Sequence, residues 1–230
     1  MRTVACHQPI YMPWPGFLYK ALKADVVVLL DNIQFPLGIS WVSRNRLKNH
    51  NGAFWLTVPV WKKGRGKQRI DEVAICNDRE WQRRQYASIT HAYKNAPYFG
   101  EHEEFLKEIF NRRWERLVDL NTAVLTYLFD ALGITREIIM GSSLGIEARA
   151  EGLLIGICRR VNAGCLASLS FGRKYLDEAT FRKQGIEVRL YRYTPPVYPQ
   201  LWGDFLPNLS TLDLLLNCGG RKGLEILQKR

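Results

Sequence analysis

Side chains that can move protons stand directly after two strand-like segments near the start of the chain. His7 and Gln8 follow the β-prone residues 3–6, and Asp31 follows the apolar run at residues 26–30. An imidazole and a carboxylate can act together as general acid and base, or each can meet a substrate separately. We therefore predict that His7 and Asp31 are catalytic, with Asp31 available to orient the imidazole.

Residues 6–16 form a poor continuation of a buried strand, because they contain three prolines. A helix can begin near Gly16, where free backbone N–H groups would favour an anion and glycine would allow close approach of a ligand. We expect substrate contacts from this segment and from the end of the second strand, namely Gln8, Tyr11, Trp14, Gly16 and Gln34.

Two arginines, Arg44 and Arg46, follow in the stretch Ser-Arg-Asn-Arg, and the chain carries a net charge of +11. Guanidinium groups bind phosphate or carboxylate through paired hydrogen bonds, so the sequence predicts an anion clamp here; the alternative is two surface charges. Residues 44–116 contain sixteen Lys and Arg against nine Asp and Glu. This surplus indicates an anionic substrate, a nucleic acid, an anionic membrane surface or simply a solvated basic face.

The elements that must position these side chains alternate between strand-like and helix-like segments. Residues 1–30 predict strand, helix and strand, a crossover that places both strand ends at one edge of a parallel sheet, where ligands bind. The alternation returns after residue 133, with strands expected at 134–140, 164–169 and 186–193 and helices at 147–161 and 175–184. The pattern predicts an α/β fold with a mostly parallel, Rossmann-like sheet.

The middle of the chain, residues 41–132, is expected to be an inserted β-hairpin and helices within a single domain spanning residues 1–230. Strand-like segments flank the basic stretch 62–69, which is predicted to be the loop of the hairpin, and three helices follow at 80–96, 103–114 and 117–132. Near the C-terminus, Tyr198 and Gln200 lie in a proline-rich loop and are expected to contact ligand. The spacing of Ser210 and Asp213 then predicts a capping box on a short helix.

Several classes of protein are disfavoured. Five cysteines without a C-x-x-C pair fit the reduced thiols of a cytoplasmic protein. The apolar runs are too short to span a membrane, and the N-terminus lacks the apolar region of a signal peptide. No metal is predicted from the spacing of the four histidines, and the cofactor stays open. Cys218 would need a lowered pKa and a nearby base to act as a nucleophile, and the sequence indicates neither.

The blocks of this sequence resemble the WbqC-like protein family over nearly the whole chain. The opening block is His-Gln-Pro-x-Tyr-x-Pro-Trp-x-Gly at residues 7–16, and later blocks include Asp-x-x-Gln-Phe at 31–35, Arg-Asn-Arg-Leu at 44–47 and Pro-Val-Tyr-Pro-Gln-Leu at 196–201. The block Ser-Phe-Gly at residues 170–172 departs from the family pattern, which has a Ser-Gly-Pro type of turn there.

The resemblance implies a role in bacterial surface polysaccharide or O-antigen biosynthesis, through transfer onto a nucleotide-linked sugar or modification of an amino sugar. Our first hypothesis is accordingly a transferase for an anionic, nucleotide-linked or otherwise activated sugar. The alternatives are a non-catalytic ligand-binding or scaffold protein of the same pathway and, from the charge alone, a nucleic-acid-binding protein. The sequence does not indicate an oligomeric state.

Overall fold

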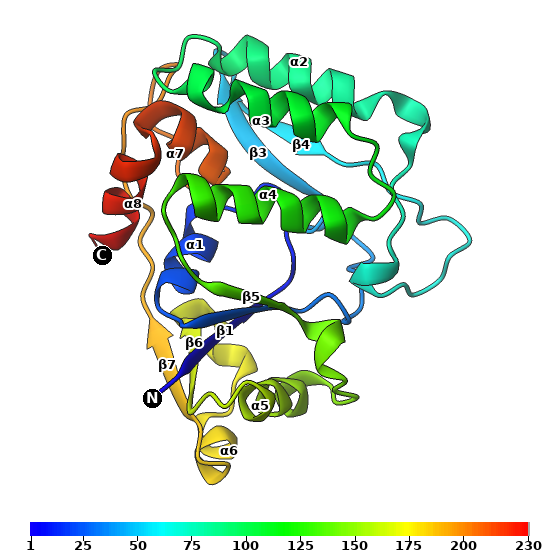
Figure 1. The fold of residues 1–230 in the computed structure, drawn as a ribbon, viewed down its shortest axis with the longest axis vertical. Coiled ribbons are helices and arrows are strands. Elements are labelled where there is room, and N and C mark those ends of the chain that lie inside the picture. Colours follow the sequence, from blue (N-terminus) through cyan, green and yellow to red (C-terminus); the bar gives the residue numbers. More distant parts are fainter. Residues whose placement is uncertain (230) are drawn as a thin grey trace.

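Five parallel strands form the central sheet of the computed structural model, which describes residues 1–229 apart from the side chains of Arg79 and Tyr175. The strands lie in the order β5-β2-β1-β6-β7 (Figure 1). Their bounds are Thr3–His7 for β1, Val26–Leu29 for β2, Glu137–Met140 for β5, Cys165–Leu169 for β6 and Glu187–Tyr191 for β7. The predicted α/β class with a parallel sheet is confirmed.

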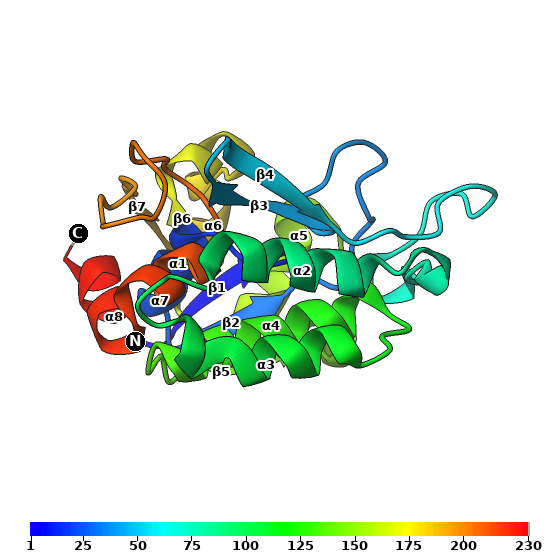
Figure 2. The same cartoon turned by 90° about the horizontal axis from the view of Figure 1, so that it is seen from above.

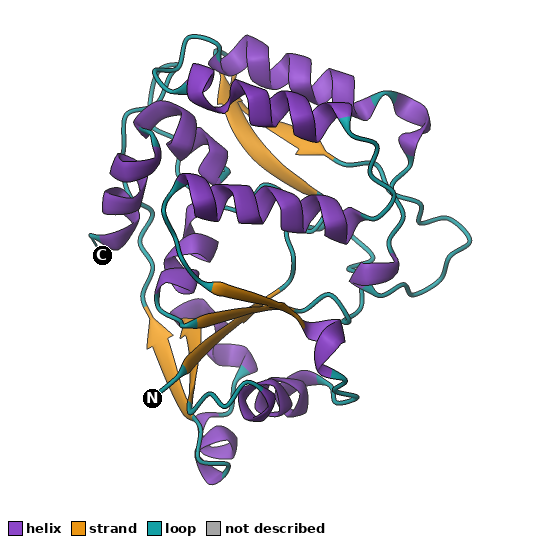
Figure 3. Cartoon of the chain, viewed as in Figure 1, coloured by secondary structure: helices purple, strands orange, loops and turns teal. Residues whose placement is uncertain are grey.

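Helices cover both faces of the sheet (Figure 3). Val26 and Val28 point to one face and pack in the apolar cluster of α5 and α6, whereas Val27 and Leu29 point to the other, into the cluster of α1 and α4. Side chains alternate along a strand, so a fully apolar β2 is what two covered faces require. The bounds of these helices are Pro15–Leu22 for α1, Leu117–Ala131 for α4, Ala150–Arg160 for α5 and Glu178–Lys183 for α6.

The order of the strands reverses direction next to β1. The chain moves from β1 to β2 and β5 on one side, and then crosses to β6 and β7 on the other. The loops after β1 and β6 lead to helices on opposite faces of the sheet, so they diverge at the carboxyl ends of neighbouring strands. This topological switch point is where open α/β sheets bind their ligands.

The inserted hairpin is present, but the predicted strands were wrong. It is formed by β3 (Arg44–Asn49) and β4 (Gly52–Thr57), which pair antiparallel, so the basic stretch 62–69 is not its turn. Residues 70–72 form a 3₁₀ turn, and only an isolated bridge joins Val60 to Ile75. The polar sequence of β3 conceals its strand, because Leu47 is its only apolar residue.

The insertion shares its core with the sheet. Helix α2 (Trp81–Tyr93) packs on β3, and α3 (Phe99–Asn111) packs on α2 (Figure 2). The apolar side chains of both helices belong to the same buried cluster as those of α1 and β2. Two helices close the chain, α7 (Thr211–Cys218) and α8 (Gly220–Gln228), of which the sequence predicted only the first.

A buried carboxylate fastens the hairpin region to the C-terminal part of the chain. Asp213 in α7 is 1% exposed and accepts hydrogen bonds from Tyr93 (2.6 Å), Tyr198 (2.8 Å), Gln200 (2.9 Å) and Asn217 (3.3 Å). Burial raises the pKa of the Asp213 carboxyl, and these donors oppose the rise. The predicted capping box is therefore half wrong, because Ser210 caps Leu212 while Asp213 turns into the core.

Replacement of this carboxylate tests its structural role. Asp213→Asn keeps the shape of the side chain but turns an NH2 group toward hydroxyl and amide donors, which leaves buried polar groups without acceptors. We expect the free energy of unfolding to fall by about 2–4 kcal/mol, measured by urea denaturation. Asp204→Asn is the control, because Asp204 is exposed. Equal stability of the two variants would contradict a structural role for Asp213.

Candidate active site

The loop that follows His7, residues 8–14, is held by side chains of the insertion. The Nδ2 group of Asn121 in α4 donates to the carbonyl oxygen of Pro9 at 2.7 Å, and that of Asn45 in β3 donates to the carbonyl oxygen of Met12 at 2.6 Å. Met12 has a φ of 46°, in the left-handed region that non-glycine residues rarely adopt. The amide contacts therefore fix an unusual backbone path immediately beside the carboxyl end of β1.

His7 is the last residue of β1 and is partly exposed at the carboxyl end of this central strand. Its Nδ1 atom lies 2.9 Å from the carbonyl oxygen of Gln8, and its ring meets Phe17 edge to face at 4.7 Å between centroids. A carbonyl oxygen only accepts hydrogen bonds, so this contact assigns the proton to Nδ1 and leaves the Nε2 lone pair as an acceptor. Burial, with the nearby charge of Lys20, lowers the pKa of His7 to about 3.

Lys20 is the residue that the sequence did not single out. It lies one turn into α1, is only 7% exposed and donates from Nζ to the carbonyl oxygen of Cys6 at 2.7 Å. Among the described residues no carboxylate pairs with it, and burial lowers its pKa to about 8. Helical side chains lean toward the N-terminus, which is how Lys20 reaches the end of β1. A lysine within an otherwise apolar helix was the available signal.

Three aromatic rings meet at the topological switch point. Trp14, at the N-terminus of α1, lies 6.2 Å from the ring of Phe171 after β6 and 5.1 Å from the ring of Tyr193 after β7. Phe171 is 62% exposed, so this cluster opens to solvent. The rings come from the segments after β1, β6 and β7 and provide flat apolar faces on which a nucleobase or sugar can stack.

Gly16 is required by Trp14 rather than by a ligand. A Cβ atom at this position would lie 2.2 Å from the indole ring, far inside van der Waals contact. The indole thus occupies the space beside the helix N-terminus where we expected an anion to approach the backbone. That expectation is corrected here, since Gly16 is itself buried under Trp14.

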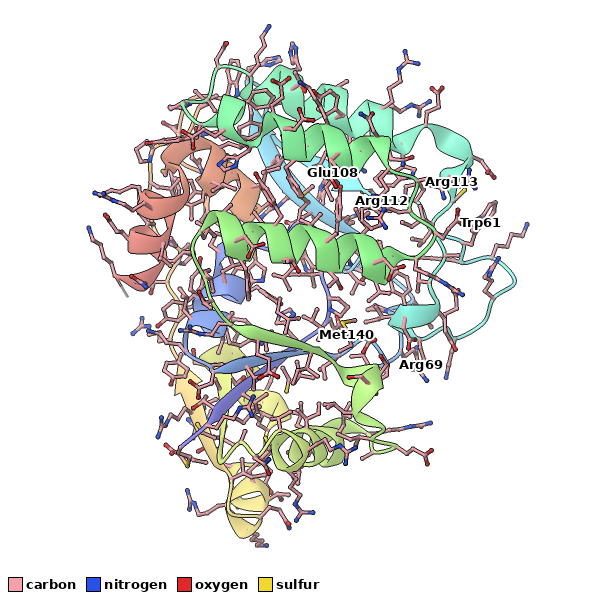
Figure 4. The ribbon with its side chains drawn as sticks, viewed as in Figure 1. Trp61, Arg69, Glu108, Arg112, Arg113 and Met140 are labelled. Atoms are coloured by element: carbon pink, nitrogen blue, oxygen red, sulfur yellow. The ribbon has the colours of Figure 1, made fainter. Side chains whose placement is uncertain are left out.

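Asp31 lies on the same edge of the sheet as His7, as the parallel pairing of His7 with Leu29 requires. Its carboxylate is 2% exposed and accepts hydrogen bonds from the backbone N–H of Ser142 at 2.8 Å and from the Ser142 hydroxyl at 2.5 Å. No hydrogen bond joins His7 to Asp31, both of which the structure describes. Asp31 therefore ties the end of β2 to the turn after β5, beyond Met140 in Figure 4, and does not orient the imidazole.

Arg44 and Arg46 project from the same face of β3 and lie over one indole ring. The guanidinium carbons are 3.7 Å and 5.6 Å from the centroid of Trp55. Both Nε atoms are buried and lack a hydrogen-bond partner within the described part of the chain, where neither arginine forms an ion pair. Stacked guanidinium groups without counter-charges are prepared for a phosphate or carboxylate.

Three other predicted contacts are engaged in hydrogen bonds within the protein. Tyr11 has no exposed surface and donates its hydroxyl proton to Gln85 at 2.7 Å, and Tyr198 and Gln200 bind the carboxylate of Asp213. These side chains therefore have partners within the fold, and their contact with substrate stays a prediction. The remaining predicted contacts are accessible: Gln8 is partly exposed, and Gln34 is exposed and bridges to Arg69.

The thiols and the possible metal ligands add nothing to this site. Burial raises the pKa of Cys218 to about 11, which is opposite to what a thiolate nucleophile needs. Among residues 1–229, His, Cys, Asp and Glu side chains form no group of three that could hold a metal ion. The helices of this part of the chain include none that is long and apolar enough to cross a membrane.

Comparison with known protein families matches residues 8–224 to the WbqC-like protein family. The chain belongs to this family. It is also 31% identical over 221 residues to an uncharacterized protein of Mycobacterium tuberculosis (Rv1507c), an alignment that covers 95% of each chain. No solved structure matches.

The close contact between Gly16 and Trp14 predicts that adding one methyl group at residue 16 disturbs the position of the indole ring. Gly16→Ala should displace the indole of Trp14 from its contacts with Phe171 and Tyr193 and lower the free energy of unfolding by about 1–3 kcal/mol, because the added Cβ atom would overlap the indole ring. Near-UV circular dichroism should report the displaced ring. Gly100→Ala is the matched control, since Gly100 also lies in a helix and an added Cβ there meets nothing within 4 Å. An unchanged spectrum for Gly16→Ala would contradict the proposed packing.

Replacement of Lys20 by an apolar residue should stabilise the fold. The difference between the ordinary lysine pKa of 10.5 and about 8 corresponds to about 3 kcal/mol of burial penalty. This penalty is complete below pH 8, where the amine is charged in the folded and unfolded chains, and it disappears as the pH rises to 10.5. Lys20→Met should therefore raise the free energy of unfolding at pH 7 by about 1–3 kcal/mol, with a smaller difference at pH 10.

Urea denaturation of the wild type and of Lys20→Met at both pH values measures this effect. Lys23→Met is the control, because Lys23 is more exposed and comes one residue after the end of the same helix. A Lys20→Met protein that is less stable than the wild type at pH 7 would show that the ammonium group is compensated within the fold.

Proposed function

We propose that this WbqC-like protein is a transferase for a nucleotide-linked or otherwise anionic activated sugar, including amino sugars, in bacterial surface polysaccharide or O-antigen biosynthesis. The observation that carries the proposal is the buried charge of Lys20, which has a carbonyl partner but no carboxylate among the described residues. A buried ammonium group without a counter-ion costs stability, and an anionic ligand at the end of β1 would offset that cost.

His7 supplies the acceptor for a proton in this proposal. Its Nε2 atom carries a lone pair, because Nδ1 is engaged with the carbonyl oxygen of Gln8. With a pKa of about 3 the free imidazole is a weak base. A bound phosphate beside His7 and Lys20 would raise the pKa of both groups, so the substrate itself would prepare the base.

The transfer step follows from these positions. A hydroxyl or amine of the acceptor would give its proton to Nε2 of His7 while its oxygen or nitrogen forms a bond to the activated carbon of the donor. The bond between that carbon and the phosphate oxygen breaks, and the leaving phosphate keeps the electron pair. Its added charge would be stabilised by Lys20 and by the arginine pair.

The arginine pair and the aromatic cluster around Trp14 support an extended ligand. Arg44 and Arg46 are stacked on Trp55 and face no carboxylate in the described part of the chain, which suits a diphosphate. Trp14 and Phe171 suit a flat nucleobase or the apolar face of a sugar ring. Asn45, which lies between the two arginines, binds the loop after His7 from the other face of β3, so a ligand that contacts both groups of side chains has to be extended.

Binding and turnover of nucleotide sugars test the proposal. We expect uridine diphosphate and uridine diphosphate N-acetylglucosamine to bind the wild type in calorimetry. Arg44→Gln should weaken binding by about tenfold or more, since it removes charge-assisted hydrogen bonds. His7→Ala should keep binding within about threefold and abolish release of the nucleotide in the presence of an acceptor extract.

Arg84→Gln is the matched control, because Arg84 is an exposed arginine of α2 outside the site. Binding that His7→Ala leaves unchanged, without any turnover by the wild type, would favour the non-catalytic ligand-binding reading. Tight binding of polyanions with a steep salt dependence and no preference for nucleotide sugars would favour nucleic acid and overturn the proposal.

A further inference from the structure

Two loops project together from one end of the molecule, at the right of Figure 2. They are residues 36–41 and 61–69, which we call the loop tip. The Nζ atom of Lys62 donates to the carbonyl oxygen of Gly38 at 3.4 Å, and the backbone N–H of Phe35 donates to the carbonyl oxygen of Gln68 at 2.9 Å. These contacts make the two loops a single surface, although about twenty residues of hairpin separate them in the sequence.

The loop tip exposes large apolar side chains. Leu37 is 68% exposed and Ile39 is 76% exposed, and the tryptophans Trp41 and Trp61 are 45% and 42% exposed. The Trp41 ring also lies 5.5 Å from Trp55, which extends the aromatic surface onto the hairpin. Single exposed apolar residues are ordinary, but aliphatic side chains at the end of projecting loops, flanked by tryptophans, mark an interaction surface.

The same surface is strongly basic. Residues 32–70 contain eight Lys and Arg and no Asp or Glu. Five of these cations lie in the loop tip, and Figure 4 shows Arg69 and Trp61 at that end of the molecule. Arg69 is paired with Asp71, whereas Lys63 and Lys67 are exposed and form no ion pair within the described residues. The local charge therefore calls for an anionic partner.

We propose that the loop tip docks on an anionic lipid bilayer, with Leu37 and Ile39 entering the boundary between headgroups and acyl chains. Tryptophan prefers that boundary, and lysines near the surface are attracted by anionic headgroups. A nucleic acid would also attract the lysines, but its phosphates offer nothing to two exposed aliphatic side chains. The combination of aliphatic ends, tryptophans and lysines fits a bilayer on each count.

Vesicle co-sedimentation of the full chain tests the proposal. Vesicles of phosphatidylcholine with 30% phosphatidylglycerol are compared with pure phosphatidylcholine at about 0.1 M and 0.5 M salt. We expect binding to the anionic vesicles that weakens at high salt. Ile39→Ser should weaken it by about tenfold, because burial of the isoleucine is lost, and Lys63→Gln with Lys67→Gln should weaken it by about tenfold or more.

The chain offers a matched control for each change. Val197→Ser removes a β-branched side chain of similar exposure, 71%, from the segment between β7 and α7, and Lys94→Gln with Lys183→Gln removes two exposed lysines outside the loop tip. Both controls should bind vesicles like the wild type. Absence of binding to anionic vesicles, or equal loss in the tip variants and their controls, would overturn the proposal. Binding that prefers a single-stranded oligonucleotide and ignores Ile39→Ser would assign the surface to nucleic acid and would also overturn it.

Discussion

The geometry of the site depends on how the backbone carbonyls of residues 8–14 find hydrogen-bond donors. The loop is rich in proline, so it cannot satisfy itself by forming a turn of regular structure. Two asparagines of the insertion, Asn45 and Asn121, supply the donors, and Thr211 adds its backbone N–H to the carbonyl of Pro13. The insertion between β2 and β5 is therefore a necessary partner of the loop that follows His7, and the two parts also share one apolar core.

The site also has an energetic cost that the rest of the fold must bear. Most buried polar side chains here have compensating partners: Asp213 has four donors, and Lys48 donates to Gln200 and to two backbone carbonyls. Lys20 and the Nε atom of Arg44 differ from these groups, because no carboxylate among the described residues pairs with either of them. Groups that are under-compensated in the free protein are the ones that gain most when an anion binds, which is why we place function at Lys20 rather than at the better-bonded carboxylates.

The sequence predicted the parallel sheet well, because its short strand-like segments alternate with helical ones. The run Val26–Leu29 is the clearest of these segments, whereas Glu187–Tyr191 is partly polar. The same alternation placed His7 correctly at the carboxyl end of β1. The sequence misassigned the hairpin, since Arg44–Asn49 is polar on its outer face and owes its strand conformation to pairing with Gly52–Thr57. It also proposed that Asp31 could orient His7. Two residues at neighbouring strand ends can turn their side chains in different directions, and the carboxylate of Asp31 turns toward the N–H and hydroxyl groups of Ser142. Contacts between residues far apart in sequence were beyond any local pattern.

The positive charge illustrates the same limit, because a net charge of +11 suggests one anionic partner where the fold separates three uses of cations. Lys48 is buried and serves the structure, since its donors satisfy carbonyls of the C-terminal loop. Arg44 and Arg46 stack on Trp55, where a small anion is sufficient to engage them. The lysines at residues 62–67 stand on an exposed loop beside aliphatic side chains, a setting that suits an extended surface. Because these groups differ in burial and in their apolar neighbours, they select different partners, and a nucleic acid is not needed to account for the total.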